Sequence, residues 1–209
     1  MRQKFCGKLN LTRRILMTQR EFLDILKVAS RLKTEKRHCF TEEGRAESVA
    51  DHSWRIALMA MLLSGVPEFK DTDMDKVIRM CLIHDLGEAF TGDIPAFMKA
   101  DSDERAEEDV YLRWVEGFPS PQKEEWLGLL KEMCELSTRE AKTYKALDKL
   151  EALISHDESD ISTWLPLEYE LQLSYGKDNV SFSPYLTKLR ELIDDWTRKK
   201  IEEEGPHRS

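Results

Sequence analysis

Residues 48–63 read SVADHSWRIALMAMLL, and this stretch decides the fold class. Its apolar residues recur with the period of an α-helix. Ser48 stands at the expected N-cap, with Asp51 three positions later as in a shortened capping box. Residues 64–67 (SGVP) then end the helix. His52 departs from the pattern, because it falls on the most apolar stripe of the predicted helix and therefore faces the core.

The helical period continues through most of the chain. Helices are expected over Phe22–Leu32 behind the N-cap Thr18, from residues 71–75 to near Gly87, and over Asp101–Val115, Ser120–Leu136, Ser137–Ser155 and Ser183–Glu203. Residues 33–45 are expected to form a loop and residues 91–95 a turn, while residues 157–179 show no clear period. Alternating β-branched runs are nearly absent. The sequence therefore predicts an all-α protein with a single domain.

The length, charge and cysteine content of the chain exclude several classes of protein. The chain has 209 residues, which suits one domain, and its net charge of −8 with no basic run argues against binding a nucleic-acid polymer. No apolar run approaches the ~20 residues of a membrane span, and residues 1–14 lack the apolar stretch of a secretory signal. The four cysteines contain no CxxC pair, so neither disulfides nor a zinc knuckle are expected. We therefore expect a cytoplasmic protein with no membrane partner.

Three more polar residues lie on predicted inward faces. His84 continues the apolar stripe Val77–Cys81, Asp85 stands beside it, and Asp148 falls on the inward stripe of another helix. Each of these residues alone is readily explained as a hydrogen-bonded or ion-paired core group. Buried carboxylates, however, cost several kcal/mol unless they are paired or bound to a metal. Together with His52 they predict a site for one divalent cation, and two nitrogen plus two oxygen ligands suit Mn, Fe, Co, Ni or Zn better than Mg or Ca.

Two further carboxylates stand beside this group. Glu88 lies about one helical turn beyond His84, and Asp93 follows on the predicted turn. Neither is needed as a ligand. Carboxylates placed next to a metal site are suited to orient or deprotonate an activated water molecule.

Three segments carry a family resemblance: residues 47–55 (ESVADHSWR), 84–95 (HDLGEAFTGDIP) and 145–150 (KALDKL). They resemble the HD-domain metal-dependent phosphohydrolases, most of all the 5′-deoxynucleotidase branch, over roughly residues 20–160. The expected organisation is an N-terminal extension at residues 1–17, an all-helical HD domain at 18–160, and a C-terminal helical extension at 161–209 packed on the same domain.

The resemblance also implies roles for residues. It implies homodimers and one divalent ion, Co²⁺ or Mn²⁺ in that branch, held by His52, His84, Asp85 and Asp148. Glu88 matches the acid that positions or activates the attacking water. Asp93 matches an acid beside the phosphate and sugar of the substrate.

The predicted substrate contacts lie upstream of His52. Arg37 matches the arginine that binds the substrate phosphate, and guanidinium geometry suits that task. The next family position is usually Trp, and here it is His38, which we expect on the pocket wall. This difference leaves the nucleoside preference open. Cys39 has no base evident in the sequence and is not expected to be a nucleophile, and His156 is not expected to be a metal ligand.

The leading hypothesis is a metal-dependent phosphomonoesterase that acts on deoxynucleoside or other nucleoside 5′-monophosphates. One alternative keeps the metal site but hydrolyses another small phosphate ester or a cyclic nucleotide. A third hypothesis is a non-catalytic helical module that binds a nucleotide or a metal, although the intact set of ligands and acids argues against it. Residues 157–203 are expected either to cover the pocket or to build the dimer.

Overall fold

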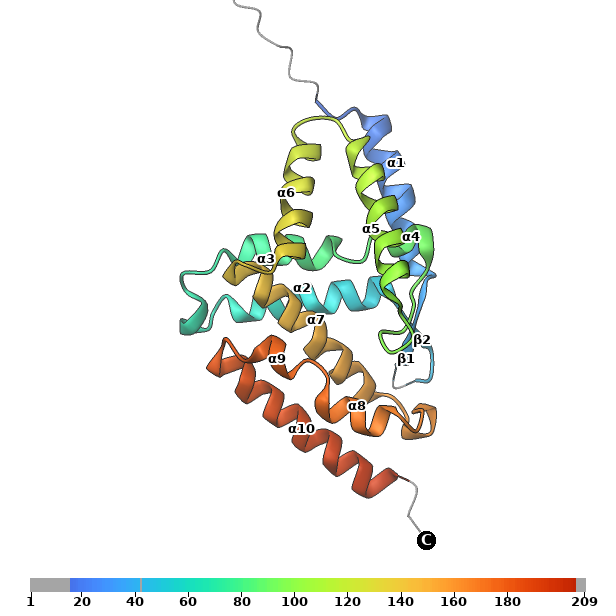
Figure 1. The fold of residues 1–209 in the computed structure, drawn as a ribbon, viewed down its shortest axis with the longest axis vertical. Coiled ribbons are helices and arrows are strands. Elements are labelled where there is room, and N and C mark those ends of the chain that lie inside the picture. The colour runs from blue at the N-terminus through green and yellow to red at the C-terminus, as the bar shows by residue number, and fades with distance from the viewer. Residues whose placement is uncertain (1–15, 42, 206–209) are drawn as a thin grey trace, which may run out of the picture.

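Three helices form the centre of the molecule: α2 (Val49–Leu63), α3 (Met74–Ile83) and α7 (Arg139–Glu158). The computed structural model describes residues 16–41 and 43–205, and Figure 1 shows these three helices crossing one another in the middle of the fold. Their facing sides are buried and apolar, with core side chains that include Ile56, Val77, Met80, Leu147 and Leu150. The predicted all-α class is confirmed.

Helix caps explain where the central helices begin. The Ser48 hydroxyl accepts from the Asp51 N–H (3.2 Å), and the Asp51 carboxylate accepts from the Ser48 N–H (2.9 Å). This is the capping box predicted at the start of α2. Asp73 caps α3 and Thr138 caps α7, each through a side-chain oxygen that accepts from the backbone N–H three residues later.

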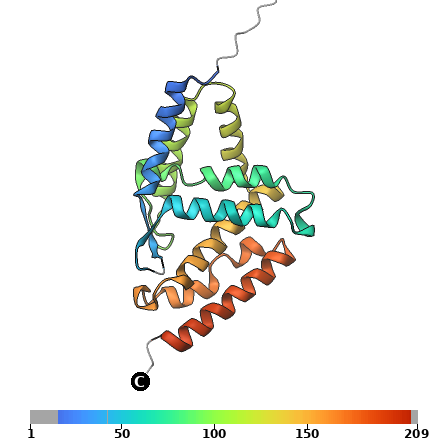
Figure 2. The same ribbon diagram turned by 180° about the vertical axis from the view of Figure 1, so that it is seen from behind.

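Two further sets of helices cover this centre. Figures 1 and 2 show α1 (Gln19–Ala29), α5 (Asp101–Glu116) and α6 (Gln122–Glu135) on one side of it. On the other side lies a C-terminal layer, which consists of α8 (Glu168–Ser174), α9 (Lys177–Val180) and α10 (Pro184–Glu204). Helices α9 and α10 contact α7 directly. Short 3₁₀ turns complete the described chain at Ser30–Lys33, Pro67–Phe69 and Ile161–Thr163.

The prediction of a loop at residues 33–45 is wrong. Strands β1 (Lys36–Phe40) and β2 (Ala46–Ser48) form an antiparallel hairpin, in which Lys36 pairs with Ser48 and Phe40 with Ala46. The strands are too short and too polar to show an alternating pattern. Their pairing depends on packing against α7, which the local sequence does not reveal.

Several other helix boundaries differ from those predicted. Helix α3 ends at Ile83, before the end near Gly87 that the sequence predicts, and the short helix α4 (Glu88–Thr91) follows and overlaps the predicted turn at Thr91. The segment 157–179, whose sequence shows no clear period, contains the end of α7, the short helix α8 and most of the short helix α9. Of the predicted N-terminal extension, only residues 16 and 17 belong to the described part. No helix in residues 16–205 has the length and apolar character required to cross a membrane.

Candidate metal centre

Four side chains from three parts of the chain meet at the centre of the fold. His52 lies in the first turn of α2, His84 caps the C-terminal end of α3 and is followed by Asp85, and Asp148 lies in the middle of α7. His52 Nε2 is 3.3 Å from Asp148 Oδ1 and 3.8 Å from Asp85 Oδ2. His84 Nε2 is 2.9 Å from Asp85 Oδ2 and 3.8 Å from Asp148 Oδ1. The structure therefore brings together the four residues that the sequence singled out as metal ligands.

The outer nitrogen of each imidazole ring is already engaged. His84 Nδ1 donates to the Cys81 carbonyl oxygen (2.9 Å), and His52 Nδ1 bonds to the Glu151 carboxylate. Both Nε2 atoms are buried and make no hydrogen bond within the described residues. Second partners of this kind orient a histidine so that its other nitrogen is presented to a metal.

This donor set fits a divalent cation. Atoms that share one ion at about 2.1 Å lie roughly 3.0–3.5 Å apart, close to the separations observed here. The surrounding carboxylates also favour a positive charge at the centre of the group. Burial and Arg37 lower the pKa of His52, but the carboxylates of Glu151 and Asp148 outweigh them and raise it to about 9. One divalent ion between the four side chains would satisfy both carboxylates and both imidazoles at once.

The two oxygens of Asp148 have different surroundings. Oδ1 faces the histidines, whereas Oδ2 lies 3.0 Å from Lys145 Nζ and 3.4 Å from Lys149 Nζ. Burial raises the pKa of Asp148, but the two ammonium groups outweigh burial and hold the pKa well below its usual range. Asp148 is therefore an ionised ligand candidate, and its Oδ1 atom is the one that faces the proposed cation position.

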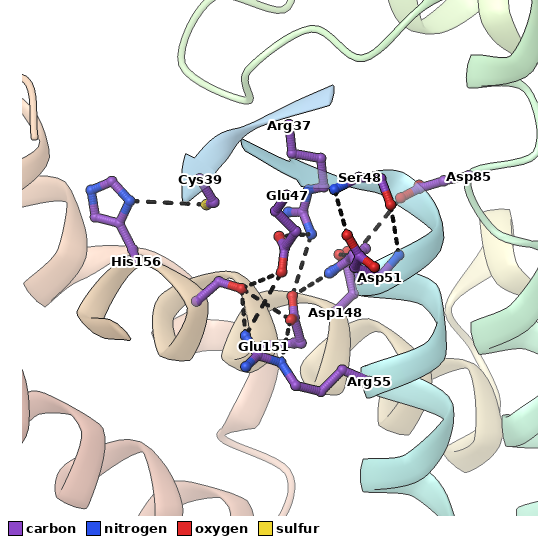
Figure 3. Close-up of polar contacts among 12 residues, drawn as sticks. Arg37, Cys39, Glu47, Ser48, Asp51, Arg55, Asp85, Asp148, Glu151 and His156 are labelled. Carbon is purple, nitrogen blue, oxygen red and sulfur yellow. Dashed lines mark hydrogen bonds and ion pairs between the residues drawn. The ribbon is translucent and has the colours of Figure 1, made fainter. Parts of the chain in front are cut away.

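Glu151 is a site residue that the sequence analysis did not single out. It is fully buried one turn after Asp148, and its oxygens contact His52 Nδ1, Arg55 Nε at 2.7 Å and Arg37 Nη1 at 3.3 Å. Figure 3 shows this carboxylate at the centre of the polar contacts between α7, α2 and the hairpin. The available signal was a charged residue within the apolar run Leu150–Ile154 of a predicted helix.

The two predicted catalytic acids lie at the same cavity. Glu88 is 6% exposed, and its Oε2 atom makes no hydrogen bond within the described chain. Burial, then the charges of Asp85 and Asp93, raise the pKa of Glu88 to about 10. Burial likewise raises the pKa of Asp93, whose N–H donates to Glu35 Oε1 (3.3 Å). Both acids are therefore biased toward holding a proton.

A cavity of about 240 Å³ joins these groups. Its lining includes seven of the eight predicted site residues, namely Arg37, His38, His52, Asp85, Glu88, Asp93 and Asp148. His84 is the eighth, and it contacts Asp85 with only 4% of its side chain exposed. The C-terminal layer forms part of the wall through Glu168, Leu171, Gln172 and Tyr175. Residues 168–175 thus form part of the pocket wall.

The comparisons with known proteins agree with this geometry. The family model described as HD domain matches residues 29–190. A 5′-deoxynucleotidase, HDDC2, of Dictyostelium discoideum is 31% identical over 141 residues, which is 64% of this chain and 74% of that protein. The 5′-deoxynucleotidase YGK1 of Saccharomyces cerevisiae is 27% identical over 198 residues, which is 88% of this chain and 82% of the relative.

A solved structure shows the same architecture. The crystal structure of a predicted metal-dependent phosphohydrolase from Magnetospirillum magnetotacticum matches with a TM-score of 0.70 and 27% identity, over 86% of this chain and 94% of that one. The family match, the relatives and the arrangement of histidines and aspartates confirm the resemblance found in the sequence. The chain belongs to the HD-domain family.

Proposed function

We propose that this protein is a metal-dependent phosphomonoesterase that removes phosphate from deoxynucleoside 5′-monophosphates. The observation that carries the proposal is the convergence of two buried imidazole nitrogens with two aspartates, with Glu88 and Asp93 at the same cavity. The 5′-deoxynucleotidase names of the relatives support the choice of substrate.

The proposed ligands are His52, His84, Asp85 and Asp148, and the proposed metal is Co²⁺ or Mn²⁺. When bound, such an ion supplies Lewis-acid activation of water and neutralises phosphate charge. Two imidazoles and two carboxylates suit late first-row metals better than Mg²⁺ or Ca²⁺.

Arg37 and two lysines are assigned to the phosphate. Arg37 lines the cavity with 14% of its side chain exposed, and Glu47 and Glu151 hold its guanidinium in place. A guanidinium fixed in this way can bind two phosphate oxygens at once. Lys145 and Lys149 line the same cavity and add positive charge.

Glu88 and Asp93 are each assigned to one of the two proton transfers that hydrolysis requires. Glu88 has a carboxyl oxygen with no hydrogen-bond partner in the described chain, and we assign it to orient the attacking water. A divalent ion held beside it would lower its pKa, and the ionised carboxylate would then take the proton that this water releases. As the new oxygen–phosphorus bond forms, the bond from phosphorus to the 5′-oxygen breaks. That oxygen needs a proton to leave as an alcohol. Asp93 lines the same cavity, and burial raises its pKa, so we assign it to supply this proton.

The test is metal analysis of the purified protein, followed by a phosphate-release screen with Mn²⁺ or Co²⁺. The screen covers deoxynucleoside and ribonucleoside monophosphates, cyclic nucleotides and small esters. We expect phosphate from deoxynucleotides first. Phosphate only from non-nucleotide esters or cyclic nucleotides would favour the alternative hydrolase, and no phosphate from any substrate would favour a binding module.

A variant separates chemistry from metal binding. Glu88→Gln should lower kcat by a factor of about 10²–10⁴, because a general base is lost. The metal content should stay at the wild-type level, since Glu88 is not a proposed ligand. Glu108→Gln, at an exposed position of α5, is the matched control. Unchanged turnover in Glu88→Gln would contradict the assigned role.

We also propose that the protein forms homodimers, as the family resemblance implies. Helix α1 supports this, because Phe22, Leu23 and Leu26 are each about half exposed, at 53%, 58% and 49%. Exposed apolar faces of this kind commonly mark interfaces. Light scattering of the purified protein tests the proposal, and a monomer at micromolar concentration would contradict it.

A further inference from the structure

A second polar cluster lies in the wall of the cavity. It consists of His38 on β1, His156 on α7 and Glu168 on α8, and all three residues line the cavity. Figure 3 shows His156 with Cys39 at one side of the site and Asp85 at the other. His156 therefore lies apart from Asp85 and Asp148, and the proposed chemistry does not use the cluster.

Glu168 holds the cluster together. Its side chain is 6% exposed, with Oε1 at 3.3 Å from His38 Nε2 and Oε2 at 3.5 Å from His156 Nε2. The Leu165 N–H donates to Oε2 at 2.6 Å. Burial raises the pKa of Glu168, but the contact with His156 and the Leu165 N–H outweigh burial, and the net pKa is lowered. An ionised carboxylate at this distance favours a proton on each facing imidazole nitrogen, since two lone pairs would repel.

His156 is enclosed by its neighbours. Its Nδ1 atom lies 3.9 Å from Cys39 Sγ, and burial raises the pKa of that thiol to about 12, so the thiol keeps its proton and can donate. Trp164 stacks on the ring at 4.5 Å and donates from Nε1 to the His156 carbonyl oxygen. His156 is thus a fixed part of the wall.

His38 is different, because it is the accessible member of the cluster. Its side chain is 32% exposed, against 9% for His156. Phe97 contacts the ring edge-on at 5.8 Å and limits its rotation. In the neutral tautomer with its proton on Nε2 toward Glu168, the ring has a lone pair on Nδ1, which makes that atom a hydrogen-bond acceptor.

We propose that His38 is a specificity-determining residue, whose Nδ1 accepts a hydrogen bond from a donor on the alcohol portion of the substrate. Glu168 is the positioning residue that sets the tautomer of the His38 ring. The donor is either a sugar hydroxyl or an exocyclic amine of the base. This inference rests on the proposed phosphomonoesterase function, and it adds which groups of the nucleoside are read and by which nitrogen.

Three substrates distinguish the two sources of the donor. They are dAMP, its 2′,3′-dideoxy analogue without the sugar hydroxyl, and dIMP, in which a carbonyl replaces the amine. His38→Phe keeps a ring but removes both nitrogens. We expect it to lower kcat/KM for dAMP about tenfold, mainly through KM, which corresponds to one hydrogen bond.

For the analogue that lacks the recognised group, His38→Phe should lower kcat/KM by a much smaller factor. A smaller loss for the dideoxy analogue identifies the hydroxyl, and a smaller loss for dIMP identifies the amine. Equal losses for all three substrates, or no loss for dAMP, would overturn the proposal.

Glu168→Gln tests the positioning role. Its amide oxygen can still accept from the Leu165 N–H, while its NH₂ group can donate to His38 Nε2 and move the ring proton to Nδ1. We expect the same substrate pattern as for His38→Phe. Glu170→Gln makes the same charge change on the exposed side of α8 and should behave as wild type.

Imidazole ¹⁵N NMR gives a readout that does not depend on turnover. His38 should carry its proton on Nε2 in the wild type and on Nδ1 in Glu168→Gln. A wild-type ring protonated on Nδ1 alone overturns the proposal. If the wild type hydrolyses no nucleotide, the proposed function fails and the specificity role fails with it. If the wild type hydrolyses dAMP, and His38→Phe changes kcat/KM equally for all three substrates or not at all, only the specificity role fails.

Discussion

At the scale of single residues, Glu151 connects the fold to the site. A fully buried carboxylate is costly, and here three positively charged or protonated partners, His52, Arg37 and Arg55, offset that cost. Burial raises the pKa of Glu151, but these partners outweigh it and lower the pKa to about 2. The ionised carboxylate then holds the His52 ring so that Nε2 faces Asp148. The same carboxylate fixes Arg37, the proposed phosphate ligand.

Glu151→Gln should therefore weaken metal binding. The loss of a charged partner behind a ligating histidine lowers metal affinity by about 10–100-fold. Titration calorimetry with Mn²⁺ measures the affinity, and circular dichroism checks the fold. Glu158→Gln is the control, because Glu158 also contacts Arg55 but its side chain is 30% exposed and it has no contact with His52. Equal Mn²⁺ affinity in the Glu151 variant and the wild type would contradict this role.

At the scale of elements, the turn after α4 places Asp93. Gly92 has φ of +82°, a region that residues with a side chain rarely adopt, and an added Cβ would lie 3.2 Å from Glu35 Oε1. Glu35 in turn accepts from the Asp93 N–H. The glycine thus permits both the turn and the contact that holds the backbone of Asp93 beside the cavity.

Two glycine substitutions should have opposite effects. Gly92→Ala should destabilise the protein by about 1–3 kcal/mol, because of backbone strain, and should also lower kcat by displacing Asp93. Gly128→Ala lies within α6, where nothing stands within 4 Å of the added Cβ. It should stabilise the protein by about 1 kcal/mol through helix propensity, without effect on kcat. Thermal unfolding measures both, at roughly 2–4 °C per kcal/mol. A shift of the same sign in both variants would show that the strain argument is wrong.

At the scale of the whole molecule, the C-terminal layer is held to the centre by buried polar contacts as well as apolar ones. Asp157 near the end of α7 is 2% exposed and accepts from the Thr197 hydroxyl of α10 at 2.8 and 3.0 Å. Burial raises the pKa of Asp157 to about 6, although the Thr197 and Gln172 hydrogen bonds oppose the increase. The α7–α10 contact therefore contains a carboxyl group that is easier to bury when protonated.

Stability should consequently depend on pH through Asp157. Between about pH 4 and 6 the folded state holds this proton and the unfolded state has released it, so the free energy of unfolding falls as pH rises through this range. Asp157→Asn removes this loss. The variant should be more stable than wild type at pH 8, by on the order of 1 kcal/mol, with the difference vanishing below about pH 4. Urea unfolding across pH measures it, with the exposed Asp195→Asn as control. A difference that does not change with pH would contradict the prediction.

The local sequence alone determined much of this protein. The helical period of residues 48–63 placed His52 inward, and the pattern around His84, Asp85 and Asp148 predicted where a cation would be held. The structure brings these side chains together, and this could be predicted because a helix places residues three and four apart on one face, so an inward polar residue is visible without knowledge of its partners. The same reasoning placed Glu88 and Asp93 next to that group.

The tertiary structure alone decided the rest. The hairpin of β1 and β2, the partners of Glu151, and the meeting of His38 with Glu168 each join segments far apart in the chain. His38 and Glu168 are 130 residues apart in sequence, and neither lies in a long periodic helix. Contacts of this kind arise from how helices pack and which short segments fill the remaining space, and a periodicity of three or four residues carries no information about them.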